Sequence, residues 1–213
     1  WVEYIPNEEL VEYMVYPRIL AIAEIGWSNP EERDYAGFKR RAIKATNELR
    51  GKGYNAFDLA NEYGQRKEAC APVENLATEG CVIYAENAPF NGKYNAGGER
   101  ALVDGLCGGW TYTDKRWQGF IKDGVDVTID LGSEKEINEI TAQFMQMCIP
   151  DVWMPAEVII SASSDGVKFK ELARIGHNVV RDEELSFKEF GWKGNTKARY
   201  IHYRAKCGPQ RGW

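Results

Sequence analysis

The pattern of hydrophobic and polar positions divides the chain into a helical part and a β part. Between Leu10 and Val15 apolar side chains recur at helical spacing, and the preceding "PNEE" is typical of a helix N-terminus. Pro17 is expected to end this helix, and a second apolar helix follows it. An acidic start, "NPEERD", predicts a third helix that ends at Gly51. A short strand is expected before the first helix.

From about Tyr54 to Glu79 the periodicity weakens, which predicts a connector. Beyond it the pattern has a period of two, and no long helix interrupts it. An antiparallel β-sandwich or barrel is therefore expected. The segments with this alternation are "CVIYA", "VDVTIDLG", "INEITAQFMQM", "AEVIISASSDG", "LSFKEFGW" and "ARYIHYRAKC".

Composition excludes several classes of function. The chain has 213 residues, 44% of them hydrophobic, which is enough for one domain and part of another. Its net charge is −5. Positions 1–79 contain 10 basic and 14 acidic residues, and positions 80–213 contain 17 basic and 18 acidic residues. Neither part has the excess of Lys and Arg that nucleic acid or anionic lipid requires. No apolar run approaches the roughly 18 residues of a membrane-spanning helix, so membrane insertion is not expected.

The cysteines and histidines do not indicate a metal site. The five cysteines are widely spaced and form no CxxC pair, so neither a zinc site nor a complete disulfide framework is expected. One disulfide bridge remains an alternative if the compartment is oxidising. His177 and His202 have no partner at ligand spacing and are interpreted as strand or loop residues.

The opening segment carries a family resemblance. It contains Trp1-x-Glu3 and "YPRILAIAEIGWS", and Phe38, Arg41 and "GYN" follow. Over about residues 1–57 it resembles the end of the catalytic domain of glycoside hydrolase family 20, the β-N-acetylhexosaminidases. The resemblance implies a remnant of a (β/α)8 barrel, in which Trp1 closes the pocket around an N-acetyl sugar and Glu3 binds sugar hydroxyls.

The same resemblance implies that this chain alone is not catalytic. The family's retaining mechanism uses the substrate's acetamido group and requires an Asp-Glu pair on an earlier barrel strand. Residues 1–57 contain no match to it, because Glu8-Glu9 and Glu31-Glu32 are interpreted as first-turn acids of helices. We therefore expect the C-terminal portion of a longer enzyme, cut at both ends, that needs no cofactor.

The second half carries another resemblance. Its motifs are "GGERALVDGLCGG", Trp117-x-Gly119, "VDVTIDLG", "MPAEVIISASSDGVKF" and "ARYIHYRA". In this order they resemble the discoidin-like domains, known from coagulation factors and from carbohydrate-binding module family 32 (CBM32). The resemblance implies a jelly-roll β-sandwich over residues 78–213 that lacks its last strand. Residues 58–77 are then a linker.

In these domains, loops at one end of the sandwich hold the ligand. The corresponding loops here are "CGGWTYTDKRWQG", "QMCIPDVWMP" and "KCGPQRGW". Sugar binding needs a flat apolar ring and planar polar partners, and Trp110, between glycines and a threonine, is the best candidate for an exposed ring. Trp117 and Trp153 are favoured as core residues. The carbohydrate-binding candidates are Trp110, Tyr112, Gln118, Asp151, Trp153 and Arg211.

The family also holds a structural calcium ion near its Leu-x-Asp-Gly turn, through backbone carbonyls and carboxylates. Asp104 matches that position. An aspartate that only shapes the turn is the alternative, because calcium requires six to eight oxygen ligands.

These resemblances imply a secreted, periplasmic or cell-surface β-N-acetylhexosaminidase that acts on glycans ending in N-acetylglucosamine or N-acetylgalactosamine. The sandwich is expected to bind N-acetylhexosamine or galactose, and the rest of the barrel is the expected partner. The alternative is a packing or protein-interaction domain, which burial of Trp110 and Tyr112 would favour. Membrane-surface binding is a third alternative, with only Lys115-Arg116 as a basic pair in the first loop.

Overall fold

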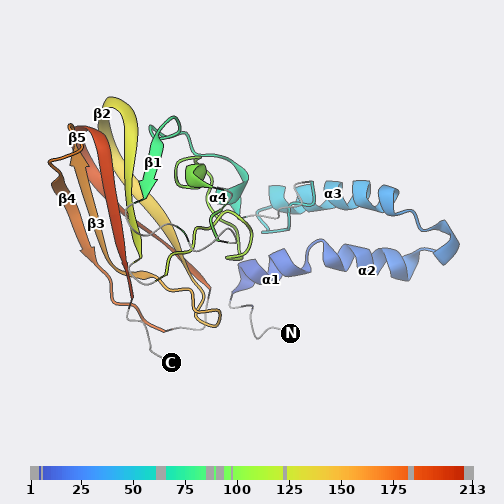
Figure 1. Cartoon of the computed structure of the whole chain (residues 1–213). Helices are drawn as coiled ribbons and strands as arrows, with labels where there is room; N and C mark the ends of the chain where they lie inside the picture. The colour runs from blue at the N-terminus through green and yellow to red at the C-terminus, as the bar shows by residue number, and fades with distance from the viewer. Residues whose placement is uncertain are drawn as a thin grey trace. The chain divides into compact units, whose positions relative to one another are not determined.

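The chain divides into two compact units in a computed structural model (Figure 1). The first unit is Trp1–Lys67 and the second is Glu68–Trp213. Their boundary lies within residues 58–77. The structure describes residues 5, 7–60, 66–84, 89, 94–96, 98–121, 124–181 and 185–208.

The first unit is helical, and its helix ends follow the local sequence. Asn7 caps the first helix, because the Leu10 N–H donates to its Oδ1 at 2.9 Å. Pro17 separates the first and second helices, and Asp34 caps the last long one through the N–H groups of Ala36 and Gly37. These boundaries confirm the predicted helices. The elements are α1 (Glu8–Val15), α2 (Arg18–Trp27), the 3-10 helix η1 (Pro30–Glu32) and α3 (Tyr35–Gly51).

The helical unit leaves much of its apolar surface exposed. No residue of α2 is buried, and Ile22 and Trp27 are 69% and 92% exposed. In α3 the buried residues are only Gly37, Ala42 and Thr46. Among the described residues, no helix combines the length and the hydropathy needed to cross a bilayer. The predicted opening strand falls on residues 1–4, outside the described residues.

The second unit contains a five-stranded antiparallel sheet with the order β1-β2-β5-β3-β4. Its strand-rich, antiparallel character confirms the predicted fold class. Two pairs of predicted segments each form one long strand, β2 and β5, and β4 was not predicted. The elements are α4 (Lys67–Cys70), β1 (Cys81–Tyr84), the 3-10 helix η2 (Glu99–Leu102), β2 (Val125–Gln146), β3 (Pro155–Ser163), β4 (Lys170–Gly176) and β5 (Ser186–Cys207).

Strands β2 and β5 fold back on themselves to make two layers. Along their ladder, Tyr203 pairs with Val127 and Phe190 pairs with Ala142. A straight strand would separate Val127 from Ala142 by roughly 50 Å. Yet the Tyr203 hydroxyl donates to the Phe190 carbonyl at 2.9 Å. The ladder must therefore bend, and its irregular register between Asp130 and Lys135 provides a place for the bend.

The main hydrophobic core lies between these layers. Val158 and Ile160 of β3 are fully buried, and they share one core cluster with Phe190 and Tyr203. The Phe144 ring meets the Phe190 ring edge to face at 5.6 Å. A second cluster contains Leu131, Ile137, Ala162, Ala198 and Ile201. The β unit thus has the inner packing of a sandwich.

Candidate functional site

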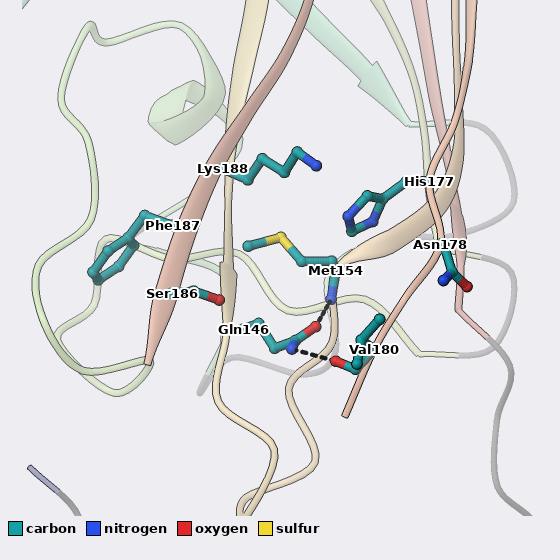
Figure 2. A pocket seen from close by; sticks show the side chains of 8 residues that line it. All are labelled: Gln146, Met154, His177, Asn178, Val180, Ser186, Phe187 and Lys188. Carbon is teal, nitrogen blue, oxygen red and sulfur yellow. Dashed lines mark hydrogen bonds between the residues drawn. The ribbon is translucent and has the colours of Figure 1, made fainter. Parts of the chain in front are cut away.

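One buried side chain ties together three segments at one end of the β unit. Gln146 is the last residue of β2, and its Nε2 donates to the Val180 carbonyl at 2.9 Å (Figure 2). Its Oε1 accepts the Met154 N–H at 3.4 Å. The loop before β3 and the segment after β4 are therefore held beside the end of β2.

These segments surround a hollow of about 230 Å³. Ser186 and Lys188 of β5 point to the same side of their strand, as the alternation of side chains requires. Figure 2 shows the Lys188 side chain extended toward His177. The lining residues are Gln146, Met154, His177, Asn178, Val180, Ser186, Phe187 and Lys188.

His177 is held in a fixed orientation at this hollow. Its Nδ1 lies 3.1 Å from the Pro155 carbonyl oxygen, and its ring meets the Phe190 ring edge to face at 5.2 Å. A carbonyl only accepts hydrogen bonds, so Nδ1 carries a hydrogen. In the neutral imidazole, Nε2 is then an acceptor.

Several polar side chains at the hollow are not used for folding. The side chains of Asn178, Ser186 and Lys188 make no hydrogen bond or ion pair with the described part of the chain. The Lys188 ammonium lies 5.3 Å from the centroid of the Phe190 ring. Val180, which is 59% exposed, adds apolar surface beside these groups, whereas Met154 belongs to the buried core. The hollow therefore combines unused donors and acceptors with a small apolar area, which suits a polar organic ligand.

An aromatic cluster packs behind the hollow. Phe187 stacks on Trp117, with centroids 5.9 Å apart, and meets Trp110 edge to face at 5.4 Å. The Trp117 indole N–H donates to the Gly109 carbonyl at 3.0 Å. A Cβ on Gly108 would lie 2.0 Å from the Trp117 ring, so this close approach requires glycine.

The expectation that Trp110 is an exposed ring is wrong. Its side chain is only 7% exposed, because it packs against Phe187 instead of facing solvent. Burying a large ring stabilises the loop more than exposing it to water would. Trp110 therefore shapes the wall behind the hollow and presents no open face for a sugar ring.

A partly buried carboxyl group organises the same loop. The Asp114 side chain accepts the backbone N–H groups of Gly109 and Arg116, the latter at 2.9 Å. Burial raises the pKa of Asp114, and the hydrogen bonds from Gly109 and Arg116 oppose that rise. Its geometry gives Asp114 a role in shaping the loop.

The other predicted carbohydrate-binding residues have local partners. The Tyr112 ring lies 6.0 Å from the Tyr94 ring. Gln118 Nε2 lies 2.9 Å from the Tyr84 hydroxyl oxygen and donates to the Gly98 carbonyl at 3.1 Å. None of the described candidates lines the hollow, so their sugar-binding role stays a prediction.

The loop between β2 and β3 holds two further candidates. Asp151 is exposed, has a φ of 65°, and accepts the Trp153 indole N–H. Trp153 is half-buried. The candidates Trp1, Glu3 and Arg211 lie outside the described residues.

Asp104 forms a turn. It is exposed, and its Oδ1 accepts the Leu106 N–H at 2.9 Å. Among the described residues, no group of three or more His, Cys, Asp or Glu side chains is placed to hold a metal ion. The calcium site implied by the resemblance uses mainly backbone carbonyls and is not a cluster of this kind, so calcium at Asp104 stays a prediction.

The sequence interpretation missed the residues that line the hollow. His177 and Asn178 follow β4, which was not predicted, and Lys188 lies within a segment interpreted only as a strand. The available signal was "ELARIGHN", a short alternating run followed by glycine and two planar polar side chains.

Residues 1–30 match the family model described as glycosyl hydrolase family 20, catalytic domain. The predicted family 20 resemblance of the N-terminal segment is confirmed. Over 55 residues the chain is also 40% identical to a Beta-hexosaminidase of Porphyromonas gingivalis. That alignment covers 26% of this chain and 7% of the relative, so the chain spans a small part of that protein.

One solved structure with some similarity is CpGH89CBM32-6 of Clostridium perfringens, which is 20% identical in sequence with a TM-score of 0.41. The alignment covers 63% of this chain and 90% of that chain. The C-terminal domain of a chitobiase from Bacteroides fragilis has 16% identity, coverages of 66% and 89%, and a TM-score of 0.43. CpGH89CBM32-5 of C. perfringens, in complex with GalNAc-β-1,3-galactose, has 17% identity, coverages of 63% and 88%, and a TM-score of 0.38. Strand register and core contacts define the two-layer fold of the β unit.

Proposed function

We propose that the chain is the C-terminal portion of a secreted, periplasmic or cell-surface β-N-acetylhexosaminidase. Its substrates would be glycans ending in N-acetylglucosamine or N-acetylgalactosamine. The match of residues 1–30 to the family 20 catalytic domain supports this proposal. The Asp-Glu pair of that mechanism has no match in residues 1–57, so catalysis would belong to the longer protein.

The helical unit would bind the rest of the catalytic barrel. Ile19, Ile22 and Ile25 recur at three-residue spacing on α2 and are 48%, 69% and 59% exposed. Helices of this kind gain most of their stability by packing such a stripe against a larger structure. This exposed apolar stripe supports the remaining barrel as the partner.

The β unit would act as a carbohydrate-binding module, with the hollow beside Gln146 as its site. One observation carries this proposal: Asn178, Ser186 and Lys188 present unused polar groups beside the exposed apolar side chain of Val180. An amide such as that of Asn178 can donate to one sugar hydroxyl and accept from its neighbour. Lys188 would donate to ring or hydroxyl oxygens, and Val180 would contact the C–H groups of the sugar.

Binding at this hollow would be weak. A shallow site of about 230 Å³ without an open aromatic face buries little apolar surface against the cost of ordering the ligand. A dissociation constant of about 0.1–1 mM is expected. Such a module would act by keeping the parent enzyme close to its glycans, which raises the local substrate concentration.

Isothermal titration calorimetry of the whole chain with N-acetylglucosamine, N-acetylgalactosamine and galactose tests this proposal by measuring the affinity for each sugar. We expect saturable binding of at least one sugar, weakened by about tenfold in Asn178→Ala because a buried sugar hydroxyl loses its partner. Asn195→Ala, at an exposed position of β5, is the matched control and should bind like the wild type. Equal affinities of Asn178→Ala and Asn195→Ala would contradict the assignment of the site.

The alternative is a packing or protein-interaction domain that binds no sugar. The burial of Trp110 favours it, because the ring expected to form a sugar platform is part of the core of its loop. Tyr112, the second ring of this criterion, is half-buried, so the criterion is met by one ring of the two. Absence of binding for all three sugars up to tens of millimolar, in a folded chain, would favour this second function.

A further inference from the structure

A second hollow lies at the other end of strand β3. It adjoins Ser163, the last residue of β3, whereas Met154, just before that strand, lines the first hollow. Nine residues of extended strand separate the two ends by roughly 30 Å. The second hollow has a volume of about 310 Å³ and is lined by Ala162, Ser163, Ser164, Asp165, Lys168, Lys170, Thr196 and Lys197.

The turn beside this hollow is held firmly by hydrogen bonds. Asp165 Oδ1 accepts the N–H groups of Val167 and Lys168, both at 2.8 Å, and the Ser163 hydroxyl at 2.9 Å. These bonds, with the Lys168 N–H first, lower the pKa of Asp165. The aspartate charge is thus used inside the turn, and Lys168 extends from an ordered backbone.

Three lysines and one aspartate line this hollow. Lys197 forms an ion pair with Glu134, in which the Lys197 Nζ lies 3.2 Å from a Glu134 carboxylate oxygen. Lys168 and Lys170 have no carboxylate within ion-pair distance in the described part of the chain. The Glu134 carboxylate also accepts the Ser164 hydroxyl at 2.6 Å, so with Glu134 counted the hollow has one more positive than negative charge, and Lys168 and Lys170 are its unpaired cations.

This lack of partners contrasts with the neighbouring strands. Glu157 of β3 pairs with Arg174 of β4 at 2.5 Å and with Lys206 of β5 at 2.5 Å. Arg199 of β5 pairs with Asp130 of β2 at 2.8 Å. Carboxylates therefore neutralise these three sheet cations, whereas no carboxylate of the described residues pairs with Lys168 or Lys170.

We propose that this second hollow binds a tetrahedral oxyanion, a sulfate or phosphate group. Lysine ammonium groups bind such anions as point charges with several donors each. Thr196 adds a hydroxyl group to the lining that makes no hydrogen bond with the described residues. A neutral sugar is a poorer fit, because the lining offers charged donors and only Ala162 as an apolar side chain. The proposal does not depend on sugar binding at the first hollow.

The test is a nuclear magnetic resonance titration of the whole chain with sodium sulfate, sodium phosphate and N-acetylglucosamine 6-sulfate at constant ionic strength. The amide signals of residues 163–170 and 196–197 should shift and saturate. The double variant Lys168→Gln/Lys170→Gln should weaken binding by about tenfold or more, because two charge-assisted donors are lost. Raising the ionic strength should also weaken binding.

The matched control is Lys44→Gln/Lys52→Gln, which removes the same charge at exposed positions of the helical unit. It should bind the oxyanion like the wild type. Equal weakening in both double variants, or shifts scattered over all lysines, would overturn the proposal in favour of non-specific attraction.

Tighter binding of the sulfated sugar than of inorganic sulfate would assign the group to a glycan, and equal binding would assign it to a free anion. Thermal melting checks that both variants fold.

Discussion

The helical unit and the β unit use similar apolar residues in opposite ways. Ile160 of β3 has no exposed surface, whereas Ile22 of α2 is 69% exposed. The β unit closes two layers around its own core, and the helical unit leaves its most apolar helix without a buried residue. This contrast teaches that the β unit has the interior of an independent domain, whereas α2 has the surface of an element that packs against a partner.

The largest effect that tests this contrast comes from matched isoleucine substitutions. Ile160→Ala should lower the free energy of unfolding of the β unit by about 2–5 kcal/mol, because it leaves a cavity in a closed core. Ile22→Ala should change stability by no more than about 0.5 kcal/mol, since its side chain is already in water. Urea denaturation measures both. Comparable losses would show that α2 is buried in the free chain and would remove the contrast.

A smaller effect should come from the hydrogen bond between the layers. Tyr203→Phe removes the hydroxyl that donates to the Phe190 carbonyl at 2.9 Å and leaves that buried carbonyl without this donor. The expected loss of stability is about 1–2 kcal/mol, read from the same urea transitions. Tyr35→Phe, at a 75% exposed position of the helical unit, is the control and should be neutral. A neutral Tyr203→Phe would mean that the layers do not depend on this bond.

The smallest effect concerns an ion pair and its pH dependence. Arg199 donates to Asp130 and holds the pKa of this carboxyl below its usual 3.8. Because the folded pKa is the lower one, the stabilisation is present above pH 3.8 and is lost as the pH falls through the folded pKa. Asp130→Asn should therefore cost up to about 1 kcal/mol at pH 7, since the pair is partly exposed, and nothing in strong acid.

Thermal melts between pH 2 and 7 check this dependence. Glu24→Gln, which breaks the ion pair with Arg41 in the helical unit, is the matched control. The Arg41 side chain is 61% exposed, so its loss should cost less than the loss of the Asp130 pair. A pH-independent penalty for Asp130→Asn would show that packing, and not charge, stabilises this position.

Much of the fold was predictable because local physical chemistry sets it. Asn7, Pro17 and Asp34 mark helix boundaries through capping and through the missing proline N–H, and these effects act within a few residues. The alternation in "VDVTIDLG" likewise predicts a strand. Sequence periodicity did not show that two predicted strands join into β2, because the bend between Asp130 and Lys135 depends on packing between layers.

The site was less predictable, because it depends on which surfaces the fold closes. Trp110 lies in a polar, glycine-rich loop that predicts exposure, yet the ring is buried on Phe187 from a strand 77 residues later in the sequence. Lys188 and His177 come together only through the antiparallel order of β3, β4 and β5. Long-range contacts of this kind leave no periodic signal in one sequence.

The central claim is that the β unit binds sugar at the hollow beside Gln146. Its most direct test is to map amide chemical-shift changes while N-acetylglucosamine, N-acetylgalactosamine or galactose is added to the whole chain. We predict saturable shifts at residues 176–180 and 186–188, and none at residues 163–170. Shifts confined to another surface, or no shifts at saturating sugar, would contradict it.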